Sequence, residues 1–168
     1  MDDFSPVGST TDEMWNRVLA VNLNGPFFAT KAAIAQFEKQ EPSGGLIVNI
    51  CSNASVHGFH AGAAYTVSKT ALLALTKSTA GFYGPKGISA IALLLGGLEN
   101  TNITDALAGG MNMEMFQRIQ ASQTPWEAGK TTVPVESVAK YIVFLSDPDI
   151  APNANGSAIS FNKNWPEA

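Results

Sequence analysis

The sequence predicts an α/β fold in which a parallel sheet of about three strands is flanked by helices. Short apolar runs that fit strands alternate with longer segments that fit helices, and this alternation is typical of parallel sheets with right-handed crossovers. The 168 residues contain no internal repeat and no linker, so we expect a single domain over 1–168. Apolar residues make up 45% of the chain and charged residues only 14%. An average globular protein has ~25% charged residues, so the composition indicates many buried faces.

The individual elements follow from where the apolar runs begin and end. Thr10 or Thr11, with Glu13 close behind, marks the start of the first helix. The expected helices have apolar residues at helical spacing, and they cover residues 11–37, 63–83 and 135–145. The expected strands are short apolar runs, and they cover 46–50, 88–95 and 157–161. Residues 96–130, rich in Met and Gly, are expected to form a flap that is either mobile over a substrate or packed as a short helix.

Charge and composition exclude several classes of protein. The net charge of −4 and the isoelectric point near 5.0 argue against nucleic acid and acidic membrane surfaces as partners. No apolar run reaches the ~18 residues that a membrane span needs. Met1 is followed by Asp2 and Asp3, which does not fit the start of a signal peptide. A single cysteine, Cys51, forms no internal disulfide and is expected to be a buried thiol at a strand end. We therefore expect a cytoplasmic protein.

Three residues at a fixed spacing carry the chemistry that the sequence predicts. Ser52 ends an apolar strand, Tyr65 follows thirteen positions later near a helix start, and Lys69 follows four positions after that. A phenol and an ammonium four residues apart lie on the same helix face. At ~4.5 Å and an effective dielectric of ~20 they interact by roughly 3.5 kcal/mol, which would bring the pKa of Tyr65 down toward ~7–8. Such a phenol exchanges protons with an alcohol or ketone near neutral pH.

The Ser–x12–Tyr–x3–Lys spacing, within LIVNICS and YTVSK, resembles the short-chain dehydrogenases/reductases. The resemblance extends in register over nearly the whole chain, through VNLNG upstream and through GPKGISAIALLLGGLENTNI downstream. It implies a partial Rossmann-like, doubly wound parallel sheet. It also implies an NAD(P)-dependent oxidoreductase that transfers hydride between nicotinamide and a small-molecule secondary alcohol or carbonyl compound.

The resemblance also implies a role for each matching residue. Tyr65 would be the general acid/base, Lys69 would lower its pKa and bind the nicotinamide ribose, and Ser52 would orient the substrate carbonyl. Asn22 would hold a water that links Lys69 to solvent, or would merely bend its helix. Gly96, Gly97 and Thr101 would line the nicotinamide, although Leu95 stands where the family usually has Pro. The tail Asn162-Lys163-Asn164-Trp165 likewise stands where Asp-Gly-Gly is common.

The family's glycine-rich turn for the cofactor pyrophosphate has no counterpart in this sequence. Neither G-x-x-x-G-x-G nor G-x-G-x-x-G follows any strand-like run. The pyrophosphate and adenosine sites are therefore absent, as is the residue that chooses between NAD and NADP. The chain is expected to be a truncated domain, the C-terminal catalytic half of a domain of about 250 residues. Its first strand, 46–50, would then be a bare apolar edge.

Two other interpretations remain open. The chain could be a catalytically inert remnant, or an interaction module that pairs with full-length relatives through the helix 65–83; the true chain could also be longer. Whether the chain is an enzyme or an interaction module, the helix 65–83 favours a homo-oligomer, because this helix often packs against its copy in a second subunit of the family's members. His57 and His60 lie near each other in the loop after the first strand, but no third ligand has a suitable spacing. We therefore expect no metal site.

Overall fold

The computed structural model describes residues 1–101 and 110–166 and shows a three-stranded parallel sheet. The strand order is β1–β2–β5, with bounds Gly45–Ser52, Ile88–Leu95 and Ala158–Phe161. Ser52 of β1 pairs with Leu95 of β2, which in turn pairs with Phe161 of β5. The carboxyl ends of all three strands therefore lie level at one edge of the sheet, where loops can build a site.

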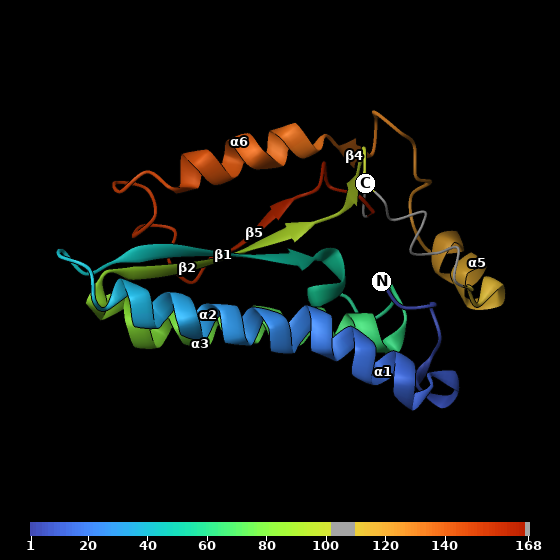
Figure 1. The fold of residues 1–168 in the computed structure, drawn as a ribbon. Coiled ribbons are helices and arrows are strands. Elements are labelled where there is room, and N and C mark those ends of the chain that lie inside the picture. Colours follow the sequence, from blue (N-terminus) through green and yellow to red (C-terminus); the bar gives the residue numbers. More distant parts are fainter. Residues whose placement is uncertain (102–109, 167–168) are drawn as a thin grey trace.

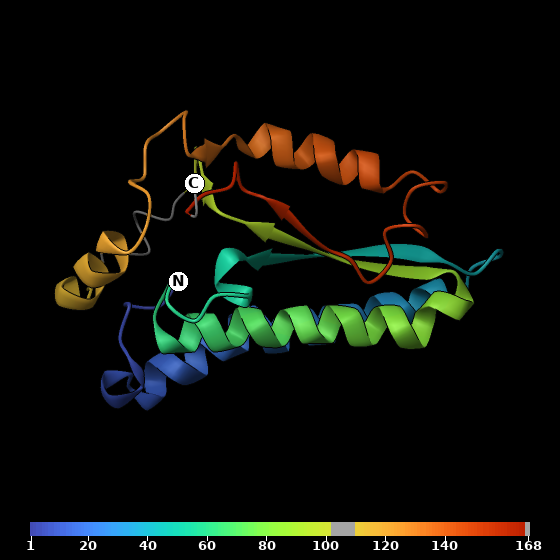
Figure 2. The same cartoon turned by 180° about the vertical axis from the view of Figure 1, so that it is seen from behind.

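Helices cover both faces of this sheet (Figure 1 and Figure 2). One face carries α1 (Asp12–Leu19), α2 (Gly25–Phe37) and α3 (Ala63–Tyr83), and the other carries α6 (Val135–Leu145). The helix α5 (Met113–Ala121) lies beyond the carboxyl ends of the strands, close to the start of the chain. The arrangement confirms the predicted α/β fold with a parallel sheet and flanking helices.

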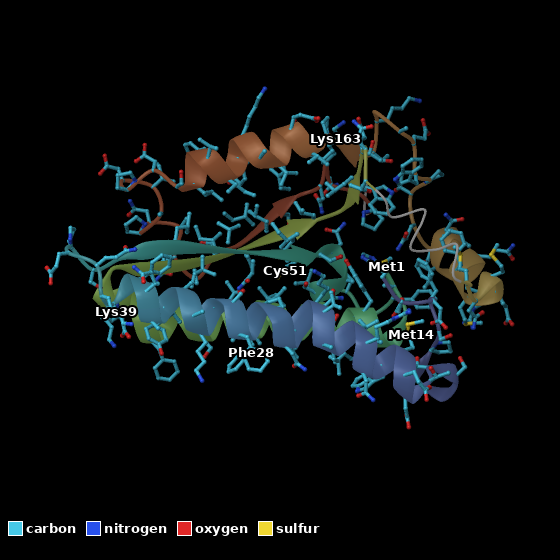
Figure 3. All side chains as sticks on the ribbon, in the orientation of Figure 1. Met1, Met14, Phe28, Lys39, Cys51 and Lys163 are labelled. Atoms are coloured by element: carbon cyan, nitrogen blue, oxygen red, sulfur yellow. The ribbon has the colours of Figure 1, made fainter. Side chains whose placement is uncertain are left out.

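The core is built on β2, of which every residue is buried. Alternate side chains of a strand point to opposite faces, and β2 uses both. Ile91, Leu93 and Leu95 pack on the α6 side with Val138 and Leu145. The residues between them face α2 and α3, where the packed side chains include Ile34, Ala80, Leu72 and Cys51. Cys51 is 2% exposed, as predicted, and lies between the sheet and the helices in Figure 3.

The first predicted helix is interrupted near its middle. Thr11 caps α1, because its Oγ1 accepts a hydrogen bond from the Met14 N–H at 3.1 Å. Residues Ala20–Asn24 then form a π-helix that leads into α2, and the Gly25 N–H donates to the Ala20 carbonyl. Pro26 lacks an N–H and cannot donate to the Asn22 carbonyl as a regular α-helix requires. Single-turn π segments of this kind are frequent at functional sites.

Most predicted bounds agree with the structure. The ranges 63–83, 88–95 and 135–145 match α3, β2 and α6, whereas β1 is longer than expected and β5 starts one residue later. Gly97–Leu98 (β3), within the predicted flap, pairs with Thr132–Val133 (β4), which follows the flap, and this two-stranded sheet was not predicted. The part of the flap at 102–109 lies outside the described residues. In the part of the chain that the structure describes, no helix is both long and apolar enough to cross a membrane.

Candidate active site

Ser52 and Tyr65 meet at the carboxyl edge of the sheet. Both line a cavity of about 330 Å³, together with Gly96 and Gly97 from the loop after β2. Ser52 is the last residue of β1, Tyr65 lies in the first turn of α3, and the Ser52 side chain is near enough to the phenol to lower its pKa. The cavity thus contains two hydroxyl groups on adjacent elements, placed to bind one substrate oxygen.

Ser52 is held by the short 3-10 helix Asn53–Ser55 that follows β1. Its Oγ accepts a hydrogen bond from the Ala54 N–H at 3.2 Å, and the Ser55 Oγ accepts one from the Ser52 N–H at 3.2 Å. This reciprocal pattern is a capping box. The Ser55 hydroxyl in turn donates to the Lys69 carbonyl in α3 at 2.9 Å. The hydroxyl of Ser52 is therefore fixed relative to the helix that carries Tyr65.

Asp2 holds the start of α3 from outside the helix. Its Oδ2 accepts a hydrogen bond from the Tyr65 N–H at 2.8 Å, and its Oδ1 accepts from the N–H groups of Gly62 and Phe4, both at 3.2 Å. The carboxylate is only 4% exposed. A Cβ at Gly62 would lie 2.5 Å from Oδ2, so this position requires glycine. The sequence alone did not reveal this cap, because the partners are 60 or more residues apart.

The pKa predicted for Tyr65 is wrong in direction. Burial of the phenol raises the pKa of Tyr65 above its usual value of 10.0, and the hydrogen bond with Ser52 offsets only part of this increase. The nearby Asp2 carboxylate and Cys51 raise the Tyr65 pKa further. The Lys69 Nζ lies 5.7 Å from the centre of the Tyr65 ring and donates its hydrogen bond to the Ile50 carbonyl at 2.8 Å. Helical spacing placed the two residues on one face but did not fix where the ammonium group points.

Lys69 and Asn22 line a second cavity of about 520 Å³, between α2 and the open edge of β1. Burial lowers the pKa of Lys69. Asn22 lies in the π-helix, and its Nδ2 donates to the Ser68 Oγ at 3.1 Å, while that hydroxyl donates to the Tyr65 carbonyl at 2.7 Å. The four predicted catalytic residues are thus divided between two neighbouring cavities, with α3 forming part of both.

The loop after β2 brings two of its three predicted residues to the first cavity. A Cβ at Gly96 would lie 3.0 Å from the Asn162 Cβ, and one at Gly97 would lie 2.7 Å from the Trp126 Nε1. Their backbone therefore lines the cavity where a side chain would not fit. This close approach beside the Ser52 and Tyr65 hydroxyls suits the flat nicotinamide end of a cofactor. Thr101 is exposed and does not line this cavity.

The C-terminal tail closes one side of the cavity. The Asn53 Nδ2 donates to the Trp165 carbonyl at 2.6 Å, and the Asn162 Nδ2 donates to the Asn53 Oδ1 at 2.6 Å. Lys163 and Asn164, at positions where the resemblance implies glycines, both have positive φ, at 52° and 59°. The tail therefore adopts the left-handed backbone that glycine would favour, without glycine. Trp126 and Trp165 line the cavity and were not predicted as site residues.

His57 and His60 stack with their ring centroids 4.5 Å apart, in the loop between β1 and α3. His60 also lines the first cavity. Within residues 1–101 and 110–166, no group of three or more His, Cys, Asp or Glu side chains is placed to hold a metal ion. Burial raises the pKa of the Cys51 thiol, which fits a packing role.

Comparison with known proteins identifies the family. The family model for short chain dehydrogenases matches residues 1–112, and the chain belongs to this family. A short chain dehydrogenase/reductase of Colletotrichum higginsianum is 39% identical over 98% of this chain and 61% of its own length. A 3beta-hydroxysteroid dehydrogenase of Eggerthella lenta is 32% identical over 98% of this chain and 61% of its own length. This chain thus spans about three fifths of the length of these relatives.

A solved structure shows the same fold. A crystal structure of a protein from Beutenbergia cavernae, assigned as an NAD(P)-dependent gluconate 5-dehydrogenase and containing bound NADP, superposes with a TM-score of 0.77. The two proteins are 26% identical, and the match covers 98% of this chain and 62% of the other. The parallel sheet and flanking helices therefore match the Rossmann-like structures of the family.

Proposed function

We propose that this chain supplies the catalytic half of an NAD(P)-dependent oxidoreductase that interconverts a secondary alcohol and a carbonyl compound. The observation that carries the proposal is the presence of Ser52 and Tyr65 together in the lining of one cavity that Gly96 and Gly97 also line. When bound, the nicotinamide supplies or accepts the hydride. The relatives and solved structures named above include hydroxysteroid and gluconate dehydrogenases, so the likeness alone does not select a substrate.

In this proposal the residues of the chain position the reacting oxygen and move its proton. Ser52 donates a hydrogen bond to the carbonyl oxygen, and Tyr65 delivers its phenolic proton to the same atom during reduction. Because burial keeps the Tyr65 pKa above its usual value, the phenol stays protonated near neutral pH and is ready to act as an acid. Lys69 and Asn22, in the neighbouring cavity, would return the proton from solvent.

The test is a titration of the purified chain with NADH and NADPH, followed by its tryptophan fluorescence, and then a carbonyl reduction assay. We expect saturable cofactor binding and reduction that is lost in Tyr65→Phe, while the far-ultraviolet circular dichroism spectrum is unchanged. Tyr83→Phe is the matched control, because Tyr83 lies at the other end of α3. The proposal would be contradicted if the folded chain bound no cofactor at concentrations up to about 1 mM. A Kd above this concentration corresponds to a binding free energy weaker than ~4 kcal/mol. The chain would then be an inert remnant or an interaction module.

We also propose that α2 and α3 pair with a second copy of this chain or with a full-length relative. A groove of about 520 Å³ runs between these helices, and its lining includes Phe27, Ile34 and Phe82. Phe82 is 77% exposed and Phe28 is 63% exposed, and Figure 3 shows Phe28 pointing away from the sheet. Exposed aromatic side chains of this kind are typical of interaction surfaces. Sedimentation analysis should show a dimer that Phe82→Ser dissociates, and a monomeric wild-type chain would contradict the homo-oligomer.

A further inference from the structure

The cavity beside Ser52 and Tyr65 is lined, among the described residues, without a Lys, Arg, Asp or Glu side chain. Its polar side chains carry hydroxyl, amide and imidazole groups: Ser52, Asn53, His60, Tyr65, Gln120 and Gln123. A carboxylate or phosphate that enters such a cavity loses its water shell and gains no ammonium or guanidinium side chain as a partner. Charged substrates are therefore disfavoured.

Aromatic rings from three separate segments form the walls. Phe4 packs edge-to-face on Phe116 of α5, with ring centroids 5.0 Å apart. Trp126 lies over the backbone of Gly97, since a Cβ there would meet its Nε1 at 2.7 Å. The Trp165 ring is fixed by a hydrogen bond from its Nε1 to the Thr124 carbonyl at 2.9 Å. Fixed rings of this kind offer flat apolar contact at little cost in side-chain freedom.

The Phe4 ring is held in place by a constrained backbone. Phe4 has φ of 64°, which is uncommon for a residue other than glycine, and its N–H donates to the Asp2 Oδ1 at 3.2 Å. Phe4 is 6% exposed and packs against α5, whose capping residue Asn112 donates its N–H to the Asp3 carbonyl at 2.9 Å. Residues 2–4 thus connect the Tyr65 helix to the aromatic wall, and strained backbone of this kind clusters at ligand sites.

We propose that this cavity selects uncharged, ring-containing, mainly apolar ketones and secondary alcohols, and discriminates against carboxylates and phosphates. The volume of about 330 Å³ is near the lower limit of ~300–1,000 Å³ for ligand sites, and a nicotinamide would occupy part of it, which favours a compact skeleton of one or two rings. Ser52 and Tyr65 bind the reacting oxygen, and Gln120 and Gln123 on the α5 side can bind a second neutral oxygen. The inference rests on the proposed function only in naming the oxygen that reacts. The binding preference itself can be measured without catalysis.

The test compares a neutral ligand with a charged ligand that has the same ring and ketone. Methyl 4-oxocyclohexanecarboxylate and its free acid share one ring and one ketone, and 2-decalone represents the bicyclic skeleton. Each is titrated into the purified chain without cofactor, and quenching of tryptophan fluorescence is followed. The buffer is held at about pH 9, where the α-amino group of Met1, which also lines the cavity and whose pKa burial lowers, is uncharged. We expect the ester to bind at least about tenfold more tightly than the acid.

The signal can be assigned to the cavity with matched variants. Trp126 and Trp165 line the cavity, whereas Trp15 lies on α1 and does not. The change in fluorescence should persist in Trp15→Phe and decrease in Trp126→Phe and in Trp165→Phe. Quenching that depended on Trp15 alone would place the ligand elsewhere and overturn the inference.

An added cation provides the sharpest comparison. Gln120 lines the cavity and is exposed, so Gln120→Lys should fold normally while placing an ammonium group at the cavity wall. It should strengthen binding of the acid about threefold or more and leave the ester unchanged. Gln117→Lys is the control, because Gln117 is exposed on the same helix but does not line the cavity.

The outcomes separate this inference from the proposed function. If the acid binds as tightly as the ester, or if no neutral ketone binds, the inference is overturned whether or not the chain binds a nicotinamide cofactor. If the ester and 2-decalone bind with the expected preference but Tyr65→Phe changes no reduction rate, the binding preference stands and the proposed oxidoreductase function fails.

Discussion

Replacing Asp2 should loosen the helix that carries Tyr65. The carboxylate accepts three backbone hydrogen bonds, from Phe4, Gly62 and Tyr65, and two of these donors lie at the start of α3. Asp2→Ala removes all three acceptor contacts and the favourable interaction of a negative charge with the helix N-terminus. Asp2→Asn keeps the shape and one acceptor oxygen but directs an amide N–H toward a backbone N–H.

The expected cost follows from these contacts. Loss of a helix cap costs about 1 kcal/mol, and each buried N–H left without a partner costs about 1–3 kcal/mol. Because water can reach part of the opened site, we expect Asp2→Ala to lower the free energy of unfolding by about 3 kcal/mol and Asp2→Asn by about 1–2 kcal/mol. For a chain of this length, a loss of about 3 kcal/mol lowers the melting temperature by roughly 6–12 °C.

Urea denaturation with linear extrapolation measures the effect. Asp3→Asn is the matched control, because the Asp3 Oδ1 accepts a single hydrogen bond, from the Ser5 N–H at 3.0 Å, and Asn retains an acceptor there. Its free energy of unfolding should differ from the wild type by less than about 0.5 kcal/mol. If Asp2→Ala were no less stable than Asp3→Asn, the buried cap would contribute nothing and the reasoning would be refuted.

The substitution Asp2→Asn should also change the pKa of Tyr65. The Asp2 carboxylate is one of the groups that raise the pKa of Tyr65, so Asp2→Asn should lower it. Ultraviolet difference spectra of phenol ionisation follow this pKa, with Tyr65→Phe as the blank for Tyr83 and Tyr141. An unchanged Tyr65 pKa in Asp2→Asn would contradict the electrostatic contact between the two side chains.

Three further results are expected. Because burial raises the Tyr65 pKa, phenol difference spectra of the chain without cofactor should show no ionisation of Tyr65 below about pH 10, and ionisation near pH 8 would contradict this. Cys51 should react with iodoacetamide only in denaturant, because the thiol is buried and its pKa is raised, and fast labelling of the native protein would show that β1 opens. Ser55→Ala should lower the free energy of unfolding by about 1–2 kcal/mol in urea denaturation, because it removes the bonds to the Ser52 N–H and the Lys69 carbonyl; a variant as stable as wild type would contradict the capping box.

The parts of the fold that depend on local pattern could be predicted from the sequence. The range 63–83 is bounded by Gly62 and by the turn that ends at Gly87 in the left-handed conformation, and both boundaries were expected. The run 88–95, apolar except for Ser89, forms a strand that is buried along its full length, as in a central parallel strand. The π-helix was missed, because apolar spacing continues through Ala20–Asn24 and hides the change in hydrogen bonding.

The parts of the site that depend on the path of loops could not be predicted. Ser52 and Tyr65 are an exception, since one short loop joins their elements and both were predicted as site residues. The contacts of Asp2 with Tyr65 and of Asn53 with Trp165 span 63 and 112 residues, and no local pattern encodes them. The lowered pKa expected for Tyr65 also failed for a structural reason, since a helix repeat fixes a face but not the side-chain rotamer or the burial that outweighs the charge.

In the proposed function, the position of the Lys69 ammonium group would determine whether Tyr65 can act as a base near neutral pH. Its Nζ now donates to the carbonyl of Ile50 in β1, at the edge of the described sheet, where another donor can compete for the same oxygen. If Nζ instead faced the phenolate at about 6 Å, an effective dielectric of ~20 gives about 3 kcal/mol, or roughly two units of Tyr65 pKa. A nicotinamide ribose that offered Lys69 new acceptors would favour such a change. Binding of NADP⁺ should therefore lower the Tyr65 pKa in the wild type but not in Lys69→Met, as measured by phenol difference spectra, and an equal decrease in both proteins would show that Lys69 does not tune Tyr65.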